Sequence, residues 1–395
     1  MNGWRRVKTA FEHREADRVP VSELYINSPV ASQVLGREAL TGWSGKVRCE
    51  IMSRMLIDGR ADEFYMREAE DLVDLYDKLD LDTIMIERPP AARPIIPTRI
   101  DDCTFRYEDR ENGLFHILHS DASSDNFHIA DSNFHRGGIE EFRRFVGLLE
   151  RDPVDLANYN WSQAEYITSR CRGRKYMMAV VEIDFPPMSM GALGGIFLEA
   201  LAFAPELCER YLDYRVRKGL KFIDHFAAMG VDCIFDGEDL AGNQGALFSP
   251  DCYRGMYMPR FLELSRVCRR HGMRYLRHTD GNIMRFADDF LLSSGFDGYQ
   301  SIDPSAGMDR ALIKERYGDR VTLMGNVDCG RALHLGTRED VKRETLDVLR
   351  TLSPGGGHIL SSSNTIHSHV PYENFMTMLE VAHRYGTYPI DAACE

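Results

Sequence analysis

The feature that most constrains the fold of this 395-residue chain is a regular alternation of short apolar runs with longer segments of helical spacing. Most of the short runs are continuously apolar, which is typical of strands buried on both faces of a parallel sheet. Segments between them, such as Pro205–Met229, repeat apolar residues at the spacing of an amphipathic helix. The eight predicted strands are Arg18–Leu24, Asp82–Glu87, Met177–Asp184, Asp232–Asp236, Met273–His278, Phe296–Gln300, Val321–Gly325 and His358–Ser362.

Eight strands alternating with helices predict an α/β fold of the (β/α)₈ class, a TIM barrel. A doubly wound open sheet is the competing architecture. It usually carries a glycine fingerprint at its first βα turn, whereas Ser22–Asn27 contains no glycine. The sequence therefore favours the barrel.

A long segment at about residues 88–160 interrupts the alternation between the second and third predicted strands. Within it, two extended runs flank Glu111-Asn112-Gly113, and Asn-Gly between such runs is a strong hairpin signal. A helix is predicted next, at Ile139–Leu149. We therefore expect one domain over residues 1–395, with a hairpin and a helix inserted into the barrel.

Composition excludes several classes of protein. The formal charge is −13, from 61 acidic and 48 basic residues, and a polyanionic nucleic acid would be repelled by it. No stretch reaches the roughly 18 consecutive apolar residues that span a membrane. Met1–Ala10 lacks the apolar core of a secretory signal, and the nine cysteines include no C-x-x-C pair. These features predict a cytoplasmic protein with reduced thiols that binds neither nucleic acid nor membranes.

Polar residues collect where the predicted strands end, and in a barrel these ends meet at one mouth. His278 and Asp280 lie two apart on an extended segment, so their side chains point to the same face. Three interpretations remain open. The two residues are a pair of metal ligands, or an imidazole that a carboxylate orients for proton transfer, or the histidine has only a structural role, with its hydrogen bonds formed inside the end of the barrel. His367 and His369 repeat this spacing in a loop, where solvated polar residues are common.

Four groups of residues, in this order and spacing, make the chain similar to the uroporphyrinogen decarboxylase superfamily, which includes cobalamin-linked methyltransferases. The family is a (β/α)₈ barrel, in agreement with the strand count. The groups are Asp17-Arg18-Val19-Pro20; Glu238-Asp239 with Ser249-Pro250; His278-x-Asp280-Gly281-Asn282; and Gly325-Asn326-Val327-Asp328 with Gly356-Gly357 and Pro371-x-Glu373-Asn374.

Two departures from the family pattern bear on function. Family decarboxylases bind their substrate's carboxylates with an arginine-containing segment after the first strand, and residues 23–28 here contain no arginine. An acidic mouth is a poor receptor for a poly-acid. Thiol-methylating members bind zinc with His-x-Cys and a later cysteine, which the resemblance places on His278, Asp280 and Asn364. A His/Asp/Asn set consists of harder, less polarisable ligands than a set with cysteine thiolates, and it would hold zinc less firmly, or not at all.

The resemblance implies a methyltransferase of a corrinoid-dependent system. Such an enzyme moves a methyl group from a small methoxylated or methylamine-like compound to a corrinoid (cobalamin) on a separate partner protein. We expect a monomer or a homodimer, with Zn²⁺ as a further candidate cofactor. The expected catalytic residues are His278, Asp280, Asp239 and Glu182; the expected substrate-binding residues are Tyr25, Glu238, Gln300, Asn326 and His367; and the expected metal ligands are His278, Asp280 and Asn364.

Two alternatives remain open at this point. The first is a decarboxylase or lyase of the same superfamily that acts on a smaller acid. The second is a non-catalytic ligand-binding homologue that has lost its site together with the cysteines.

Overall fold

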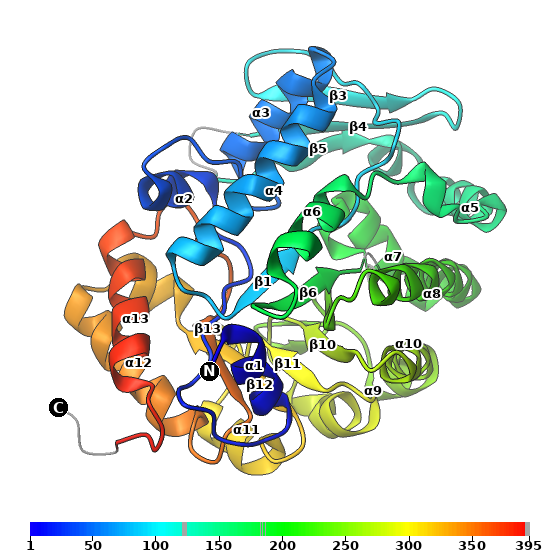
Figure 1. The fold of residues 1–395 in the computed structure, drawn as a ribbon. Coiled ribbons are helices and arrows are strands. Elements are labelled where there is room, and N and C mark those ends of the chain that lie inside the picture. The colour runs from blue at the N-terminus through cyan, green and yellow to red at the C-terminus, as the bar shows by residue number, and fades with distance from the viewer. Residues whose placement is uncertain (121–124, 182, 184, 186, 392–395) are drawn as a thin grey trace.

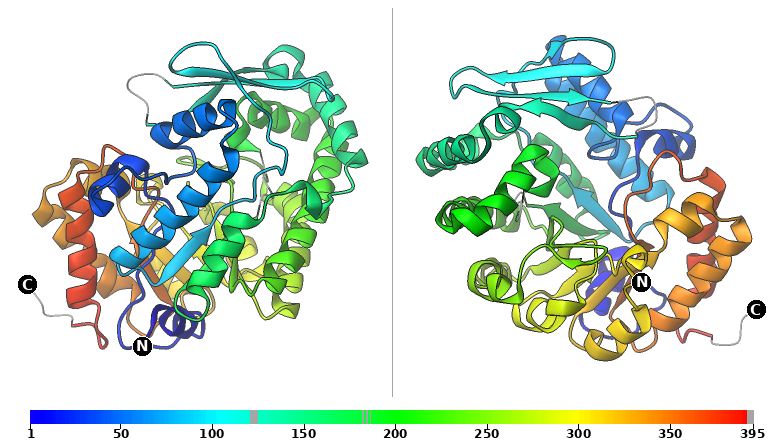
Figure 2. Two further views of the ribbon diagram at one scale, coloured as in Figure 1. Left: turned by 45° about the horizontal axis from the view of Figure 1, so that its top comes forward. Right: turned by 180° about the vertical axis from the view of Figure 1, so that it is seen from behind.

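The computed structural model describes residues 1–120, 125–181, 183, 185 and 187–391. Helices surround a central curled sheet, and a second sheet lies to one side (Figures 1 and 2). The central sheet is parallel and its strand order follows the chain, β1-β6-β7-β10-β11-β12-β13. Its strands are β1 (Thr83–Ile86), β6 (Tyr176–Val180), β7 (Cys233–Gly237), β10 (Arg274–His278), β11 (Gly298–Gln300), β12 (Thr322–Val327) and β13 (His358–Ser362). The fold is therefore mixed α/β and TIM-like, with a curled seven-stranded sheet.

The first predicted strand, Arg18–Leu24, is wrong as a strand, because only isolated bridges form there. Val21 bridges Leu360 of β13 in parallel, and Asp82, just before β1, donates its N–H to the Val21 carbonyl at 2.8 Å. The N–H of Val21 is taken by the Asp82 carboxylate at 2.8 Å, and Pro20 has no N–H to offer. The segment thus hydrogen-bonds on both sides without forming a regular ladder.

The region between β1 and β6 carries the second sheet, which is antiparallel with the order β2-β3-β4-β5. β3 and β4 pair on either side of Glu111-Asn112-Gly113, and α5 follows where a shorter helix was predicted. The strands outside the central sheet are β2 (Thr98–Arg99), β3 (Thr104–Asp109), β4 (Leu114–His119), β5 (His128–Ser132), β8 (Ala241–Gly242) and β9 (Gly245–Ala246).

Most of the crossovers between the parallel strands contain α-helices, and these form the outer layer in Figure 1. Several amphipathic helices bury one face against the sheet, as the helical spacing predicted. The helices are α1 (Gly3–Phe11), α2 (Ser28–Leu35), α3 (Lys46–Ile57), α4 (Ala61–Lys78), α5 (Asn133–Arg151), α6 (Ser162–Cys171), α7 (Ala192–Phe203), α8 (Pro205–Ala228), α9 (Pro250–Cys252), α10 (Met258–Arg270), α11 (Arg310–Tyr317), α12 (Arg338–Leu352) and α13 (Tyr372–Tyr385).

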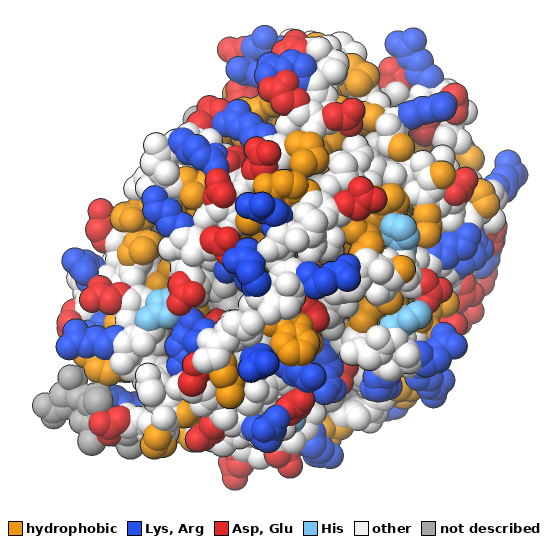
Figure 3. Space-filling view, viewed as in Figure 1, with side chains coloured by type: hydrophobic (Ala, Val, Ile, Leu, Met, Phe, Trp, Pro, Cys, Tyr) orange, Lys and Arg blue, Asp and Glu red, His pale blue; other side chains and the backbone are white. Residues whose placement is uncertain are grey.

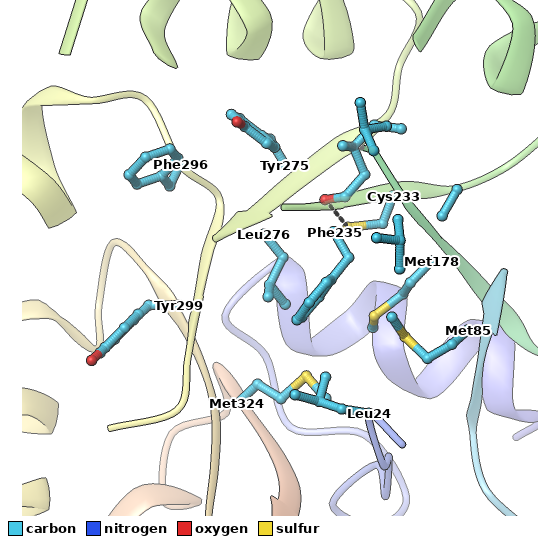
Figure 4. Packing of buried hydrophobic residues seen from close by; sticks show 14 of the residues in the cluster. Leu24, Met85, Met178, Cys233, Phe235, Tyr275, Leu276, Phe296, Tyr299 and Met324 are labelled. Atoms are coloured by element: carbon cyan, nitrogen blue, oxygen red, sulfur yellow. Dashed lines mark hydrogen bonds between the residues drawn. The ribbon is translucent and has the colours of Figure 1, made fainter. Parts of the chain in front are cut away.

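The interior of the curled sheet is filled by one side chain from each of several strands. In Figure 4, Met85, Phe235, Leu276 and Met324 point toward one another, and all are buried. Alternate residues of β10, such as Tyr275, point to the other side, toward the surrounding helices. This two-residue alternation decides which polar side chains can face the mouth of the sheet.

Helix α1 covers the N-terminal ends of the parallel strands (Figure 1). The Phe11 ring stacks on Tyr176, the first residue of β6, with centroids 5.5 Å apart. Thr322, the first residue of β12, donates its hydroxyl to the Ala10 carbonyl at 3.4 Å. With this end covered, a site for a small molecule belongs at the C-terminal ends of the strands.

On the face shown in Figure 3, acidic and basic side chains are interspersed and form no extended patch of one sign. Over the described residues, no helix combines the length and the apolar character that crossing a bilayer requires.

The loop that leaves β10 depends on a glycine. Gly281 has φ +83°, and a Cβ there would lie 2.3 Å from the Ala241 carbonyl oxygen in β8. The next residue, Asn282, donates its N–H to the Gly242 carbonyl at 3.0 Å. A side chain at 281 would therefore push the β10 loop away from β8.

We expect Gly281→Ala to lower the free energy of unfolding by roughly 3 kcal/mol or more, because backbone strain and overpacking add. Gly272→Ala is the matched control, since its φ is +73° and nothing lies within 4 Å of the added Cβ. That variant should lose only about 1 kcal/mol. Urea titrations of both variants measure the difference, and equal losses would contradict the proposed close approach.

Candidate active site

A histidine and two aspartates meet at the C-terminal end of the curled sheet. His278 is the last residue of β10 and shares its face with Leu276, so its ring points toward the interior of the mouth. Its Nε2 lies 3.8 Å from Asp239 Oδ1 and 3.9 Å from Asp280 Oδ1. The imidazole is largely buried, with 14% of its side chain exposed, whereas Asp239 is 45% exposed. The cluster is therefore anchored on its histidine and open to solvent on its Asp239 side.

The orientation of the imidazole is set by the neighbouring strand. His278 Nδ1 hydrogen-bonds Gln300 Oε1, and the Gln300 amide donates in turn to the Ser363 carbonyl at 3.0 Å. An amide oxygen only accepts hydrogen bonds, so Nδ1 carries the proton and Nε2 is left with a lone pair in the neutral ring. Gln300 is fully buried, which fixes this arrangement. The lone pair is therefore directed toward the two carboxylates.

Asp280 is held by two hydrogen bonds besides its contact with His278. Ser301 Oγ donates to Asp280 Oδ1 at 2.7 Å, and Asn364 Nδ2 donates to Oδ2. Burial raises the pKa of the Asp280 carboxyl, His278 lowers it and the nearby charge of Asp239 raises it further. The backbone N–H of Asp280 donates to Asp239 Oδ1 at 2.8 Å, which ties the two acidic loops together.

These side chains fit a divalent metal ion. One ligand atom from each of Asp239, His278 and Asp280 lies within 4.8 Å of the other two. Zinc sits about 2.0–2.2 Å from nitrogen and oxygen ligands, so tetrahedral ligands lie roughly 3.4 Å apart, slightly closer than the two distances to Nε2. The bond from His278 Nδ1 to an oxygen is also what metal-binding histidines commonly make. Asn364 was predicted as a ligand. Its amide nitrogen donates to Asp280 and its amide oxygen accepts the N–H of Thr365 at 2.6 Å, and Asp239 is the third residue of the candidate metal cluster.

A buried glutamate, Glu23, is connected to the cluster through a series of hydrogen bonds. Glu23 Oε1 accepts the N–H of Ser362 at 3.0 Å, and Ser362 Oγ bonds both Glu23 Oε2 and the Asn364 carbonyl. A hydroxyl has one proton, so only one of those two bonds can be donated by Ser362. A protonated Glu23 supplies the other, in keeping with burial raising the pKa of Glu23 to about 8. This chain reaches Asn364 and hence Asp280.

A buried ion pair on the outer face of β10 holds the loop that carries Asp239. Arg277 is fully buried, 3.3 Å from Asp236 on β7, and the Tyr275 hydroxyl donates to Asp236 at 2.7 Å. The Arg277 guanidinium also donates to the Glu238 carbonyl at 2.7 Å. The pair therefore fixes the backbone one residue before Asp239.

The structure brings His278, Asp280, Asp239, Gln300 and Asn364 together, and gives the other predicted residues different surroundings. Glu238 is buried beside the cluster and is held through its carbonyl. The amide of Asn326 is fully buried and donates to the Ile302 carbonyl at 2.8 Å, a supporting role for the backbone.

His367 lies in another group of side chains, where its ring contacts His334 at 5.2 Å and His369 at 5.7 Å between centroids. Tyr25 is half-buried. Burial raises the pKa of its hydroxyl group, and the charge of Glu87 is the largest electrostatic contribution to this rise. Its backbone carbonyl accepts the N–H of Ile366 at 2.9 Å, so Tyr25 lies beside the loop that follows β13. Glu182 lies outside the described residues.

Two residues of the mouth were missed by the sequence analysis. Ser301, which holds Asp280, directly follows the strand-end residue Gln300. Glu87 directly follows β1 and is buried, so the strand-end rule applied to the second predicted strand would have found it.

Comparison with known proteins places the chain in context. A family model described as uroporphyrinogen decarboxylase (URO-D) matches residues 196–385, just under half of the chain. The uroporphyrinogen decarboxylase of Alkalilimnicola ehrlichii is 26% identical over 184 residues, which cover 46% of this chain and 47% of that protein. The uroporphyrinogen decarboxylase of Legionella pneumophila strain Corby is 37% identical over 75 residues, 19% of this chain and 21% of that protein. The chain thus spans about half the length of the Alkalilimnicola relative.

Among solved structures, a methyltransferase from Methanosarcina mazei superposes with a TM-score of 0.63 at 16% identity, over 98% of this chain and 99% of that one. At this identity the match demonstrates a shared fold and nothing finer. Together these matches confirm the resemblance to the uroporphyrinogen decarboxylase superfamily that the sequence motifs indicated.

The raised pKa of Glu23 predicts a pH dependence of stability. Its pKa is about 8 in the fold and about 4.5 in the unfolded chain, so the folded state binds the extra proton between these values. The stabilisation is fully present below about pH 4.5 and is lost as the pH rises through about 8.

Glu23→Gln keeps a neutral donor and acceptor in place, so we expect it to flatten the fall in unfolding free energy between pH 5 and 9. Urea titrations of both proteins across that range measure the effect. A variant whose stability falls with pH as steeply as that of the unaltered chain would show that Glu23 is ionised in the fold.

Proposed function

We propose that this chain is a methyltransferase of a corrinoid-dependent system, which takes a methyl group from a small methylated compound and passes it to a corrinoid on a separate protein. The observation that carries the proposal is the Asp239–His278–Asp280 cluster at the C-terminal end of a curled parallel sheet. We take that sheet to be a (β/α)₈ barrel in which residues 20–22 occupy the place of the missing first strand. The name of the Methanosarcina neighbour, a methyltransferase, points to the same chemistry.

The chemistry requires help at the atom that loses the methyl group. When the bond from carbon to oxygen or nitrogen breaks, the leaving atom gains an electron pair and needs a proton or a Lewis acid. His278 is the proton donor in this proposal, acting in its imidazolium form through Nε2, while Gln300 fixes the ring. Asp280 and Asp239 lie within 4 Å of that nitrogen and orient and stabilise the charged ring. A divalent ion held by the same three residues would supply Lewis-acid assistance instead.

The second candidate function is decarboxylation of a small acid. It is favoured by the family model and by the curated relatives, whose printed names are uroporphyrinogen decarboxylase. The chemistry of the cluster argues against it, since a substrate carboxylate would face Asp239 and Asp280. Release of carbon dioxide from a small acid in the absence of corrinoid would favour this second function over methyl transfer.

We expect His278→Ala to lower methyl-transfer turnover by roughly 10²–10⁴-fold, the usual contribution of a general acid. The assay follows the reduced corrinoid spectroscopically, with a corrinoid protein and a panel of methyl ethers and methylamines. His271→Ala is the control, because this more exposed histidine ends α10 and pairs with Asp224 at 2.7 Å, away from the cluster. Turnover that survives His278→Ala unchanged would reject the assignment.

Metal analysis addresses the Lewis-acid arrangement. In that arrangement, where a metal ion on His278 replaces proton donation by its ring, we expect about one divalent ion per purified chain, with most of it lost in Asp239→Asn, because the amide is a much weaker ligand than the carboxylate. Inductively coupled plasma mass spectrometry gives the stoichiometry, and Asp213→Asn, a change on the outer helix α8, serves as the control. A chain that takes up no metal even after incubation with Zn²⁺ would leave proton donation by His278 as its role.

A further inference from the structure

A cavity lies at the C-terminal end of β1, and its lining contains none of the three residues of the Asp239–His278–Asp280 cluster. We call it the Trp43 cavity. It has a volume of about 570 Å³ and lies between the end of β1, helices α3 and α4, and the antiparallel sheet β3–β5. This volume falls within the range of about 300–1,000 Å³ that is usual for small-molecule sites.

The walls of the Trp43 cavity are mainly apolar and flat. Trp43 lies at its entrance, 37% exposed, and Phe127 and Tyr159 contribute further ring surfaces. Pro89 and Pro90 form part of the wall next to β1. Aromatic and proline surfaces of this kind pack well against a planar ring.

One carboxylate at the cavity has an unused oxygen. Glu87 is only 4% exposed, and its Oε2 has no hydrogen-bond partner among the residues that the structure describes. A buried polar atom without a partner is costly, so such atoms mark places where water or a ligand completes the hydrogen bonding. A ligand that donates a hydrogen bond from a hydroxyl group would satisfy Glu87.

The charges around the cavity balance. Arg48 and Glu68 form a buried ion pair, and Gln163 donates to the second Glu68 oxygen at 2.8 Å. The guanidinium of Arg88 lies over the Trp43 ring at 4.0 Å, and the lining of the cavity contains two guanidinium groups together with the carboxylates of Glu68 and Glu87. A lining with two charges of each sign gives no net attraction to a cation or to an anion. It suits a neutral ligand.

The cavity and the active-site cluster lie at the same edge of the central sheet. Glu87 directly follows β1 and His278 ends β10, and the two strands run parallel in one sheet. A ligand bound at Glu87 therefore lies at the edge of the sheet that carries the cluster.

We propose that the Trp43 cavity binds a neutral aromatic ring that carries a hydroxyl group, with the ring against Trp43 and the hydroxyl donating to Glu87. Where methyl transfer is concerned, this inference rests on the proposed function and names its substrate class, a methoxylated phenol. Products of the reaction would be a dihydroxylated ring and a methylated corrinoid. The ether oxygen would take up one proton as its bond to the methyl carbon breaks.

Binding is tested first, by isothermal titration calorimetry at pH 8 with 2-methoxyphenol. This pH lies above the pKa of Glu87, which burial raises to about 7, so the carboxylate only accepts hydrogen bonds. Methoxybenzene, which lacks the donor, and the tetramethylammonium ion, which is cationic, are the comparison ligands. We expect 2-methoxyphenol to bind at least tenfold more tightly than either. Equal or tighter binding of methoxybenzene or tetramethylammonium would overturn the proposal.

Variants then locate the site. Glu87→Leu should weaken 2-methoxyphenol binding at least tenfold, whereas Glu87→Gln, which still accepts a hydrogen bond, should stay within about threefold of the unaltered chain. Trp43→Ala provides an independent test, because this partly exposed ring can be removed without emptying the core. Phe203→Ala, at a side chain that is 79% exposed at the end of α7, is the matched aromatic control and should bind normally. Unchanged affinity in both Glu87→Leu and Trp43→Ala would overturn the assignment.

The two proposals fail in different ways. His278→Ala should bind 2-methoxyphenol normally and lose methyl transfer. If the unaltered chain binds the ring but transfers no methyl group, the cavity assignment stands and the proposed function falls. If methyl transfer from 2-methoxyphenol proceeds unchanged in Glu87→Leu and Trp43→Ala, the function stands and the cavity assignment falls.

Discussion

The pleat of β10 is the constraint on which the candidate site depends. Successive residues of a strand face opposite sides of the sheet. Because Leu276 points into the core, His278 points to the same side and Arg277 to the opposite side. The parallel register sets Gly237 and Gln300 beside His278 on the neighbouring strands. Gly237 leaves room for the ring, since a Cβ there would lie 3.2 Å from His278 Cδ2, and Gln300 supplies the hydrogen bond that orients it.

The outer face of the same strand explains how a loop can be held firmly enough to carry Asp239. Arg277 is a fully buried charge, and the Asp236 carboxylate and the Glu238 carbonyl offset part of the cost of burying it, although Nε and Nη1 have no hydrogen-bond partner among the described residues. Charged groups so arranged contribute little net stability compared with apolar packing. They do penalise any rearrangement that would separate them, which favours a single geometry for the acidic loop.

Much of the site could be predicted from the sequence, because parallel strands converge at their C-terminal ends whatever their exact boundaries are. That rule alone brought His278, Asp280 and Asn364 to one place. It could not assign the role of Asn364, which depends on the direction of one amide, nor the loss of the first strand, which depends on the Asp82 carboxylate taking the N–H of Val21. Both outcomes follow from side-chain hydrogen bonds between residues more than 60 positions apart, and no local pattern encodes these.

The same geometry relates the cluster and the Trp43 cavity. Each lies at the C-terminal end of a parallel strand, β10 for His278 and β1 for Glu87, and the curl of the sheet turns both ends toward one mouth. The antiparallel sheet between β1 and β6 covers the Glu87 side and contributes Leu118 of β4 and Ile129 of β5 to the cavity wall. Apolar walls are thus present where this sheet covers the mouth, while the His278 side is polar and open at Asp239. A ligand with a flat apolar ring and a polar edge matches that division.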